Sequence, residues 1–153
     1  MFKACQNGET KVVQLLLERC NPEESGLNIK DEWGYTSFMV ACKFGHKDVV
    51  QLLLDHSEII EPNARSNGGW TALMYACFNG HKDVVQLLLD HSERIDLNAR
   101  DNYGGNAFME ACYNGHKDVV QLLLDHSERI DLNARCNHGI TAFMWACRNG
   151  HKD

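Results

Sequence analysis

The sequence has little positive charge, no long apolar run and no arrangement of cysteines that suggests disulfide pairing. Lysine and arginine number 15 against 21 aspartate and glutamate residues, for a formal net charge of −6. Because such a chain repels phosphate groups, nucleic acid and anionic membrane surfaces are disfavoured as partners. No apolar stretch is long enough to span a membrane, and the first residues lack the layout of a signal peptide. A chain of 153 residues, 44% apolar and 24% charged, is typical of one soluble folded domain.

The seven cysteines are odd in number, and the chain has no Cys-x-x-Cys pair and no Asn-x-Ser/Thr glycosylation sequon. Most of them recur at one position of a 35-residue period, which predicts one small buried thiol in each layer of a stacked structure. This series consists of Cys42, Cys77, Cys112 and Cys147, and Cys5 lies at the matching point of the incomplete first unit. Cys20 and Cys136 lie outside it. We therefore expect a reducing compartment, either the cytoplasm or the nucleus.

Internal repetition is the dominant feature of the chain. The ten residues 45–54 recur at 80–89 and 115–124, and segment 79–100 is identical to segment 114–135. A fixed period of 35 residues predicts a solenoid, in which each unit buries its apolar face only against its neighbours. We expect one array over residues 1–153, with full units at 31–65, 66–100 and 101–135 and partial units at 1–30 and 136–153.

Each unit contains the pattern of a turn, two short helices and a loop. A glycine turn is followed by a residue able to cap a helix N-terminus, namely Thr36, Thr71, Asn106 or Thr141. In the first full unit the pattern predicts a helix from Ser37 to Phe44, ended by Gly45. A second helix is predicted from about Lys47 to His56, and its wide apolar stripe indicates neighbours on several sides.

Four segments of the unit together resemble the ankyrin repeat over essentially the whole chain. They are Asp31-x-x-Gly34-x-Thr36, Ala41-Cys42-x-x-Gly45-His46, Val49-Val50-x-Leu52-Leu53 and Asn63-Ala64-Arg65. The resemblance implies an all-α solenoid of stacked helix-turn-helix repeats with β-hairpin-like fingers. It also implies a binding face for proteins, formed by the finger tips and the concave first-helix side. The recurring His46, His81, His116 and His151 are implied to be structural residues that hydrogen-bond backbone.

The units depart from the family pattern in three ways. The usual Thr-Pro-Leu-His becomes Thr36-Ser37-Phe38-Met39, so the proline and the histidine are lost, and packing of a stacked methionine column is expected to offset the loss. The unit exceeds the usual length of about 33 residues, and the extra residues fall between Leu54 and Asn63, in the second helix or the loop after it. The last unit stops at Asp153. This favours a second reading, an architectural spacer or fragment of a larger multi-repeat protein that can self-associate end to end, although a monomer is expected.

Comparison of the units with one another shows where they vary. The second helix barely changes, whereas the finger and one side of the first helix do, and all three tryptophans and all four tyrosines lie at these variable positions. The predicted partner-binding residues are Trp33, Tyr35, Phe44, Trp70, Tyr75, Phe78, Tyr103, Glu110, Tyr113 and Trp145. The alternative is that the rings pack against adjacent fingers and only stiffen the array. On the binding interpretation, alanine at Trp70 and Tyr75 abolishes partner capture and leaves the helices intact.

Catalytic and cofactor sites are not predicted. Asp55-His56-Ser57 and its copies contain the residue types of a hydrolase triad, but three consecutive residues at a helix end point in different directions. The periodic histidines contribute one imidazole to each layer, which does not fit a metal site. No glycine-rich phosphate loop is present. The predicted function is therefore non-catalytic binding of another protein, without a cofactor.

Overall fold

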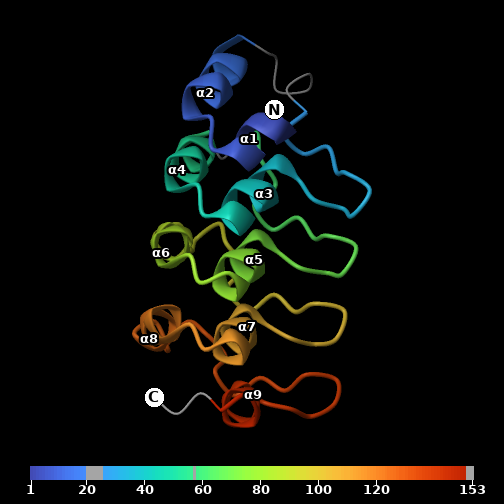
Figure 1. Cartoon of the computed structure of the whole chain (residues 1–153), viewed down its shortest axis with the longest axis vertical. Coiled ribbons are helices and arrows are strands. Elements are labelled where there is room, and N and C mark those ends of the chain that lie inside the picture. Colours follow the sequence, from blue (N-terminus) through green and yellow to red (C-terminus); the bar gives the residue numbers. More distant parts are fainter. Residues whose placement is uncertain (20–25, 57, 151–153) are drawn as a thin grey trace.

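The computed structural model describes residues 1–19, 26–56 and 58–150, which form a stack of helices (Figure 1). The helices are α1 (Phe2–Asn7), α2 (Thr10–Arg19), α3 (Ser37–Phe44), α4 (Lys47–Asp55), α5 (Ala72–Phe78), α6 (Lys82–Asp90), α7 (Ala107–Asn114), α8 (Lys117–Leu124) and α9 (Ala142–Arg148). No β-strand occurs among the described residues. The predicted all-α class and the positions of both helices of a unit are confirmed.

The helices form two columns. Helices α1, α3, α5, α7 and α9 follow one another in the first column, and α2, α4, α6 and α8 in the second (Figure 1). Each helix contacts the next one in its own column, and four antiparallel pairs, such as α3 with α4, form the layers. The loops that precede α3, α5, α7 and α9 project away from the second column as fingers (Figure 1). The first column and the fingers therefore border a common face.

The first helix of a layer begins and ends where the sequence predicts. The Thr36 hydroxyl accepts a hydrogen bond from the Met39 backbone N–H at 3.3 Å, and Thr71, Asn106 and Thr141 cap their helices in the same way. Gly45 ends α3 in the left-handed conformation, with φ of 74°. This conformation favours glycine because it carries no Cβ.

The core fills the space between the columns. Val49, Val50, Leu53 and Leu54 of α4 are buried, and their copies in α6 are buried as well. Of the predicted methionine column, Met39, Met74 and Met109 are buried, whereas Met144 is exposed. Because α4 ends at Asp55, the extra residues of the repeat lie in the following loop and not in the helix. Each of these loops buries one isoleucine against the core, namely Ile60, Ile95 or Ile130.

Asparagine side chains connect the layers at two levels. In the fingers, the Asn67 backbone N–H donates to the Trp33 carbonyl at 3.0 Å, and its side-chain amide donates to the Glu32 carbonyl at 2.9 Å. Asn102 and Asn137 repeat the side-chain bond to the finger before them. In the loops after the second helices, Asn63 donates to the Arg94 carbonyl and accepts from the Asp96 N–H, both at 2.8 Å. The fingers are thus hydrogen-bonded to one another although they contain no strand.

The periodic cysteines are buried except at the last layer. Burial raises the pKa of Cys5 to about 12 and that of Cys112 to about 11, and it also raises the pKa of Cys42 and of Cys77. The prediction of burial is wrong for Cys147, which is exposed because no described element covers that side of α9. Cys136 is half-buried, and Cys20 lies outside the described residues. The six described cysteines are unpaired.

Candidate functional site: an aromatic face between fingers and first helices

A chain of aromatic rings runs along the face that the fingers and the first column border. The Trp33 and Tyr35 ring centroids lie 6.4 Å apart, and Tyr35 meets Tyr75 edge-on at 5.2 Å. Trp70 lies 5.0 Å from Tyr75 and 5.2 Å from Phe78. A second group begins one layer further on, where Tyr113 and Trp145 meet edge-on at 5.2 Å. The rings hold one another in place, so this face is preformed.

Three adjacent hollows lie along this face. The first, of about 440 Å³, lies between α1, α3 and the first finger and is lined by Phe2, Trp33, Tyr35, Lys43 and Phe44 among others. The second, of about 350 Å³, lies between two fingers and is lined by Trp33, Tyr35, Trp70 and Tyr75 among others. The third, of about 410 Å³, is called the central groove below. It is lined by Trp70, Phe78, Asp101, Tyr103, Gly105, Met109, Glu110, Tyr113, Cys136, His138 and Trp145.

All ten residues predicted from the sequence as contacts line one of the three hollows, but they differ in accessibility. Trp33 is 59% exposed and Tyr103 is 69% exposed. Phe44, Phe78 and Tyr113 are also exposed, whereas Tyr35, Trp70, Glu110 and Trp145 are half-buried.

Tyr75 occupies a different environment. It is only 8% exposed, and its hydroxyl donates to the Ser66 hydroxyl at 3.0 Å. Because the Tyr75 side chain fills a core position between Tyr35 and Trp70, its replacement by alanine should lower the stability of the fold in addition to any effect on partner capture. Tyr75 thus packs against neighbouring rings while it also lines the second hollow.

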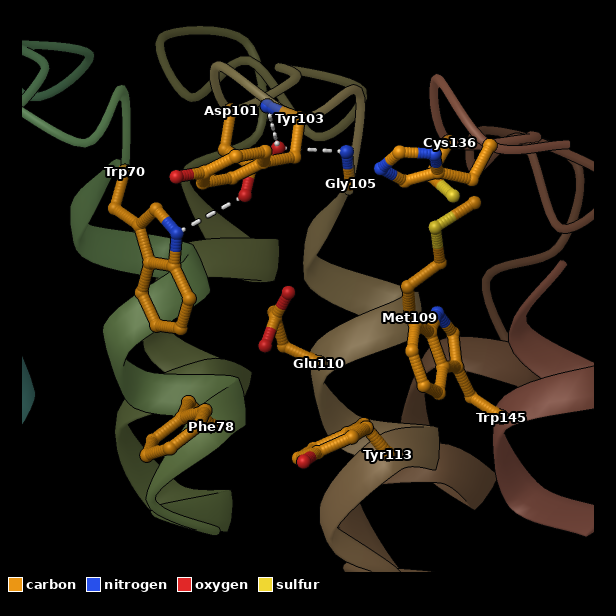
Figure 2. Close-up of a pocket in the computed structure, with 11 residues that line it drawn as sticks. Trp70, Phe78, Asp101, Tyr103, Gly105, Met109, Glu110, Tyr113, Cys136 and Trp145 are labelled. Carbon is orange, nitrogen blue, oxygen red and sulfur yellow. Dashed lines mark hydrogen bonds between the residues drawn. The ribbon is translucent and has the colours of Figure 1, made fainter. Parts of the chain in front are cut away.

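The central groove is built from three layers (Figure 2). Trp70 and Phe78 form one wall, and Tyr113 and Trp145 lie on the other side, with Glu110 between the two pairs (Figure 2). Asp101 fixes the upper rim. Its Oδ1 accepts from the Gly105 N–H at 2.7 Å and from the Tyr103 N–H at 2.9 Å, while Oδ2 accepts from the Trp70 indole N–H at 3.1 Å.

Glu110 is the group with the most perturbed acidity in the groove. Burial, with a smaller contribution from the negative charge of Asp101, raises the pKa of its carboxyl from 4.5 to about 7. Within the described residues, no hydrogen-bond donor or cation is paired with this carboxylate. The groove therefore contains an acidic group whose charge the protein itself does not compensate.

The first hollow shows how rings of this face accommodate a cation. The Lys43 ammonium lies 4.6 Å from the centroid of the Tyr35 ring and 5.8 Å from that of Tyr75, and it donates to the Tyr35 hydroxyl at 3.4 Å. No lysine or arginine of the described chain lines the central groove. Arg148 stacks on Trp145 beside it, at 5.4 Å from the ring centroid.

The open side of α9 is a second apolar surface. Phe143 is 77% exposed, whereas Phe38, at the same position of an inner layer, is 2% exposed. Met144 is exposed too, and Leu124 of α8 lines a neighbouring hollow of about 290 Å³. The difference arises because the described chain contains no further layer against α9.

Comparison with protein families assigns this architecture. A model described as ankyrin repeats, in three copies, matches residues 1–101 and 93–153. The chain belongs to the ankyrin-repeat family. Ankyrin repeats are generally modules of protein–protein interaction and are typically non-catalytic. No curated protein matched the sequence in a search.

The ankyrin histidines have the structural role that the resemblance implied. His46, His81 and His116 each hydrogen-bond through Nε2 to a backbone carbonyl at 2.8–2.9 Å. In each case the carbonyl belongs to the first helix of the layer before. His81 also lies against Gly45, where a Cβ would come within 2.6 Å of its Nδ1. His151 lies outside the described residues. The histidine and the helix-ending glycine thus join each layer to the next.

The repeated Asp-His-Ser segments of the ankyrin array have separate partners. The Asp90 carboxylate accepts from Gln86 at 2.8 Å, and His91 Nδ1 bonds to the Leu87 carbonyl at 2.9 Å. The aspartate and the histidine are therefore not hydrogen-bonded to each other as a catalytic triad requires. The described residues contain no cluster of three or more histidine, cysteine or acidic side chains that could hold a metal, and none of their helices is long and apolar enough to cross a membrane.

The structure adds groove residues that sequence reasoning did not select. Asp101, Met109 and His138 line the central groove together with Gly105. Gly105 carried a signal, because the aligned positions hold Tyr35, Trp70 and Ile140. A missing side chain among large ones indicates a cavity at that layer. Met109 gave none, since a methionine recurs at its position in every layer from α3 onward, and Asp101 gave none, since an aspartate also begins the first finger, at Asp31.

Proposed function

We propose that this ankyrin array binds another protein along the face of the three hollows. The observation that carries the proposal is the continuity of the hollows: the first two share Trp33 and Tyr35, and Trp70 links the second to the central groove. Tryptophan and tyrosine provide large rigid contact areas with one polar group each. Because the rings are already held by neighbours, little side-chain freedom is lost on association.

The proposal also covers the contact residues, the boundaries of the repeats, the compartment and the oligomeric state. The contact residues are the ten predicted ones, with Tyr75 acting as a support for Tyr35 and Trp70. The chain is one array with unit boundaries after residues 30, 65, 100 and 135. It acts without catalysis or cofactor, in the cytoplasm or nucleus, as a monomer.

A capture experiment with matched variants tests this proposal. The double variant Trp33→Ala/Tyr103→Ala removes two exposed rings, whereas Leu15→Ala truncates an exposed side chain on α2, in the other column. Proteins captured from a lysate by the parent and by Leu15→Ala, but lost with the double variant, identify partners of the aromatic face. Equal capture by all three proteins, each with unchanged circular dichroism, would refute the assignment of the face.

The exposed surface of α9 favours a second candidate, association of the array through its end. Phe143 and Met144 present apolar area that inner layers bury. On this proposal the average mass in light scattering rises with concentration, and Phe143→Ser lowers it. A mass equal to one chain at every concentration would exclude self-association.

A further inference from the structure

The central groove differs chemically from the other two hollows. Its layer carries Glu110 where the other layers carry Val40, Tyr75 and Trp145, and Gly105 where they carry Tyr35, Trp70 and Ile140. A Cβ at Gly105 would lie 3.4 Å from the Glu110 carboxylate. A ring at position 105 would therefore occupy the space into which that carboxylate extends, and its absence leaves the groove open.

The walls and the floor of the groove have complementary properties. Trp70, Phe78, Tyr113 and Trp145 surround the carboxylate (Figure 2). The faces of such rings attract cations, as the position of Lys43 over Tyr35 shows in the first hollow. At the positions that correspond to Lys43 in the three layers of the groove, the chain has Phe78, Tyr113 and Arg148. Arg148 lies over the Trp145 ring but does not line the groove, so among the described residues no cation of the chain lines the space around Glu110.

We propose that the central groove receives an arginine side chain of the partner protein, which pairs with the Glu110 carboxylate and stacks between the aromatic rings. This inference rests on the proposed function, since it names the chemistry of the partner at one point of the aromatic face. Both carboxylate oxygens of Glu110 lack a described partner, whereas those of Asp101 already accept three hydrogen bonds. A guanidinium group can donate to both oxygens of one carboxylate at once.

Arginine fits the groove better than lysine for two physical reasons. A guanidinium ion is more weakly hydrated than an ammonium ion, so less hydration is lost when it enters a space walled by rings. Its planar face also stacks on aromatic side chains, as Arg148 does on Trp145.

Binding of arginine should depend on pH through Glu110, because the guanidinium ion pairs with its ionised form. One pH unit below the pKa of about 7 most of the carboxyl is protonated, and affinity falls by up to about tenfold. Other titratable groups face or line the same space, and they are Cys77, Asp101, Tyr103, Cys112, Tyr113, Cys136 and His138. The variant His138→Asn serves as a control, since the pH dependence should persist in it.

The test uses three small probes: Nα-acetyl-arginine methylamide, the lysine analogue, and the uncharged citrulline analogue of arginine. Binding is followed by NMR through the indole N–H signals of Trp70 and Trp145. We expect the arginine probe to bind about tenfold more tightly than citrulline above the pKa of Glu110. Glu110→Gln should remove this preference. Equal binding of arginine and citrulline, tighter binding of the lysine probe, or no binding would overturn the proposal.

A second variant keeps the test valid if Glu110→Gln folds poorly. Gly105→Tyr copies Tyr35, whose backbone N–H bonds to Asp31 as that of Gly105 bonds to Asp101. It should retain the fold and Glu110 but exclude the arginine probe, and undiminished binding would count against the groove as the site. Failure here is distinct from failure of the proposed function, which Trp33→Ala/Tyr103→Ala tests by capture of proteins.

Discussion

Replacement of Glu110 by glutamine should make the ankyrin array more stable above neutral pH. The carboxyl has its pKa raised from 4.5 to about 7, so the folded state prefers the protonated form. A preference of this size corresponds to roughly 3 kcal/mol. Its sign follows from proton linkage. Between these two pKa values the folded state binds more protons than the unfolded state, so stability falls as pH rises through this window.

The expected result is therefore a difference that depends on pH. Below pH 4.5, where Glu110 is protonated in both states, the glutamine variant should differ little from the parent. Above pH 7 the variant should be more stable by roughly 1–3 kcal/mol, the lower values allowing for incomplete hydrogen bonding of the buried amide.

Urea denaturation of both proteins across this pH range measures the effect. Groups that do not interact with Glu110 contribute equally in both proteins and cancel in the comparison. As a control, Glu128→Gln changes an exposed carboxylate outside the groove and should show no such pH dependence. A free-energy difference between parent and Glu110→Gln that stays constant from pH 4.5 to 8 would refute the reasoning about the burial of this group.

Three further perturbations test the parts of the structure that recur in every layer: the buried leucines, the helix-ending glycines and the periodic cysteines. Leu53→Ala, at a fully buried position of α4, should cost about 2–5 kcal/mol in urea denaturation, and a loss near zero would contradict its burial. Gly45→Ala should lower the thermal midpoint markedly, because a Cβ there meets His81 and a left-handed backbone disfavours alanine. Cys147, which is exposed, should react with an alkylating reagent long before Cys42, which is fully buried with a raised pKa. Peptide mass spectrometry measures this order, and equal rates would disprove it.

The frame could be predicted from the sequence because its signals recur in every layer. Thr36 and its equivalents cap helices through one local hydrogen bond, and Gly45 ends α3 through its own backbone. Such features depend on neighbours in the sequence. The period then placed equivalent residues in one column without any knowledge of the distances between layers.

The properties of the face could be predicted only in part. Variation among the layers located its residues, but it could not separate Tyr75, which is buried, from Trp33, which is exposed. That distinction depends on the bond to Ser66 and on rings from adjacent fingers. The acidity of Glu110 likewise depends on how deeply its carboxyl is buried and on the charge of Asp101, and no sequence pattern sets either.

The paired contact of a glycine with the next histidine has a consequence for how such a chain can change over time. Gly45 meets His81 and Gly80 meets His116 in the same way, and each histidine bonds to a carbonyl of the first helix in the layer before its own. Since the junctions are interchangeable, a whole layer could be duplicated, deleted or swapped as a cassette without redesign of its borders. The side chains of the fingers and first helices can then change from layer to layer, while any loss of folding stability stays confined to one layer.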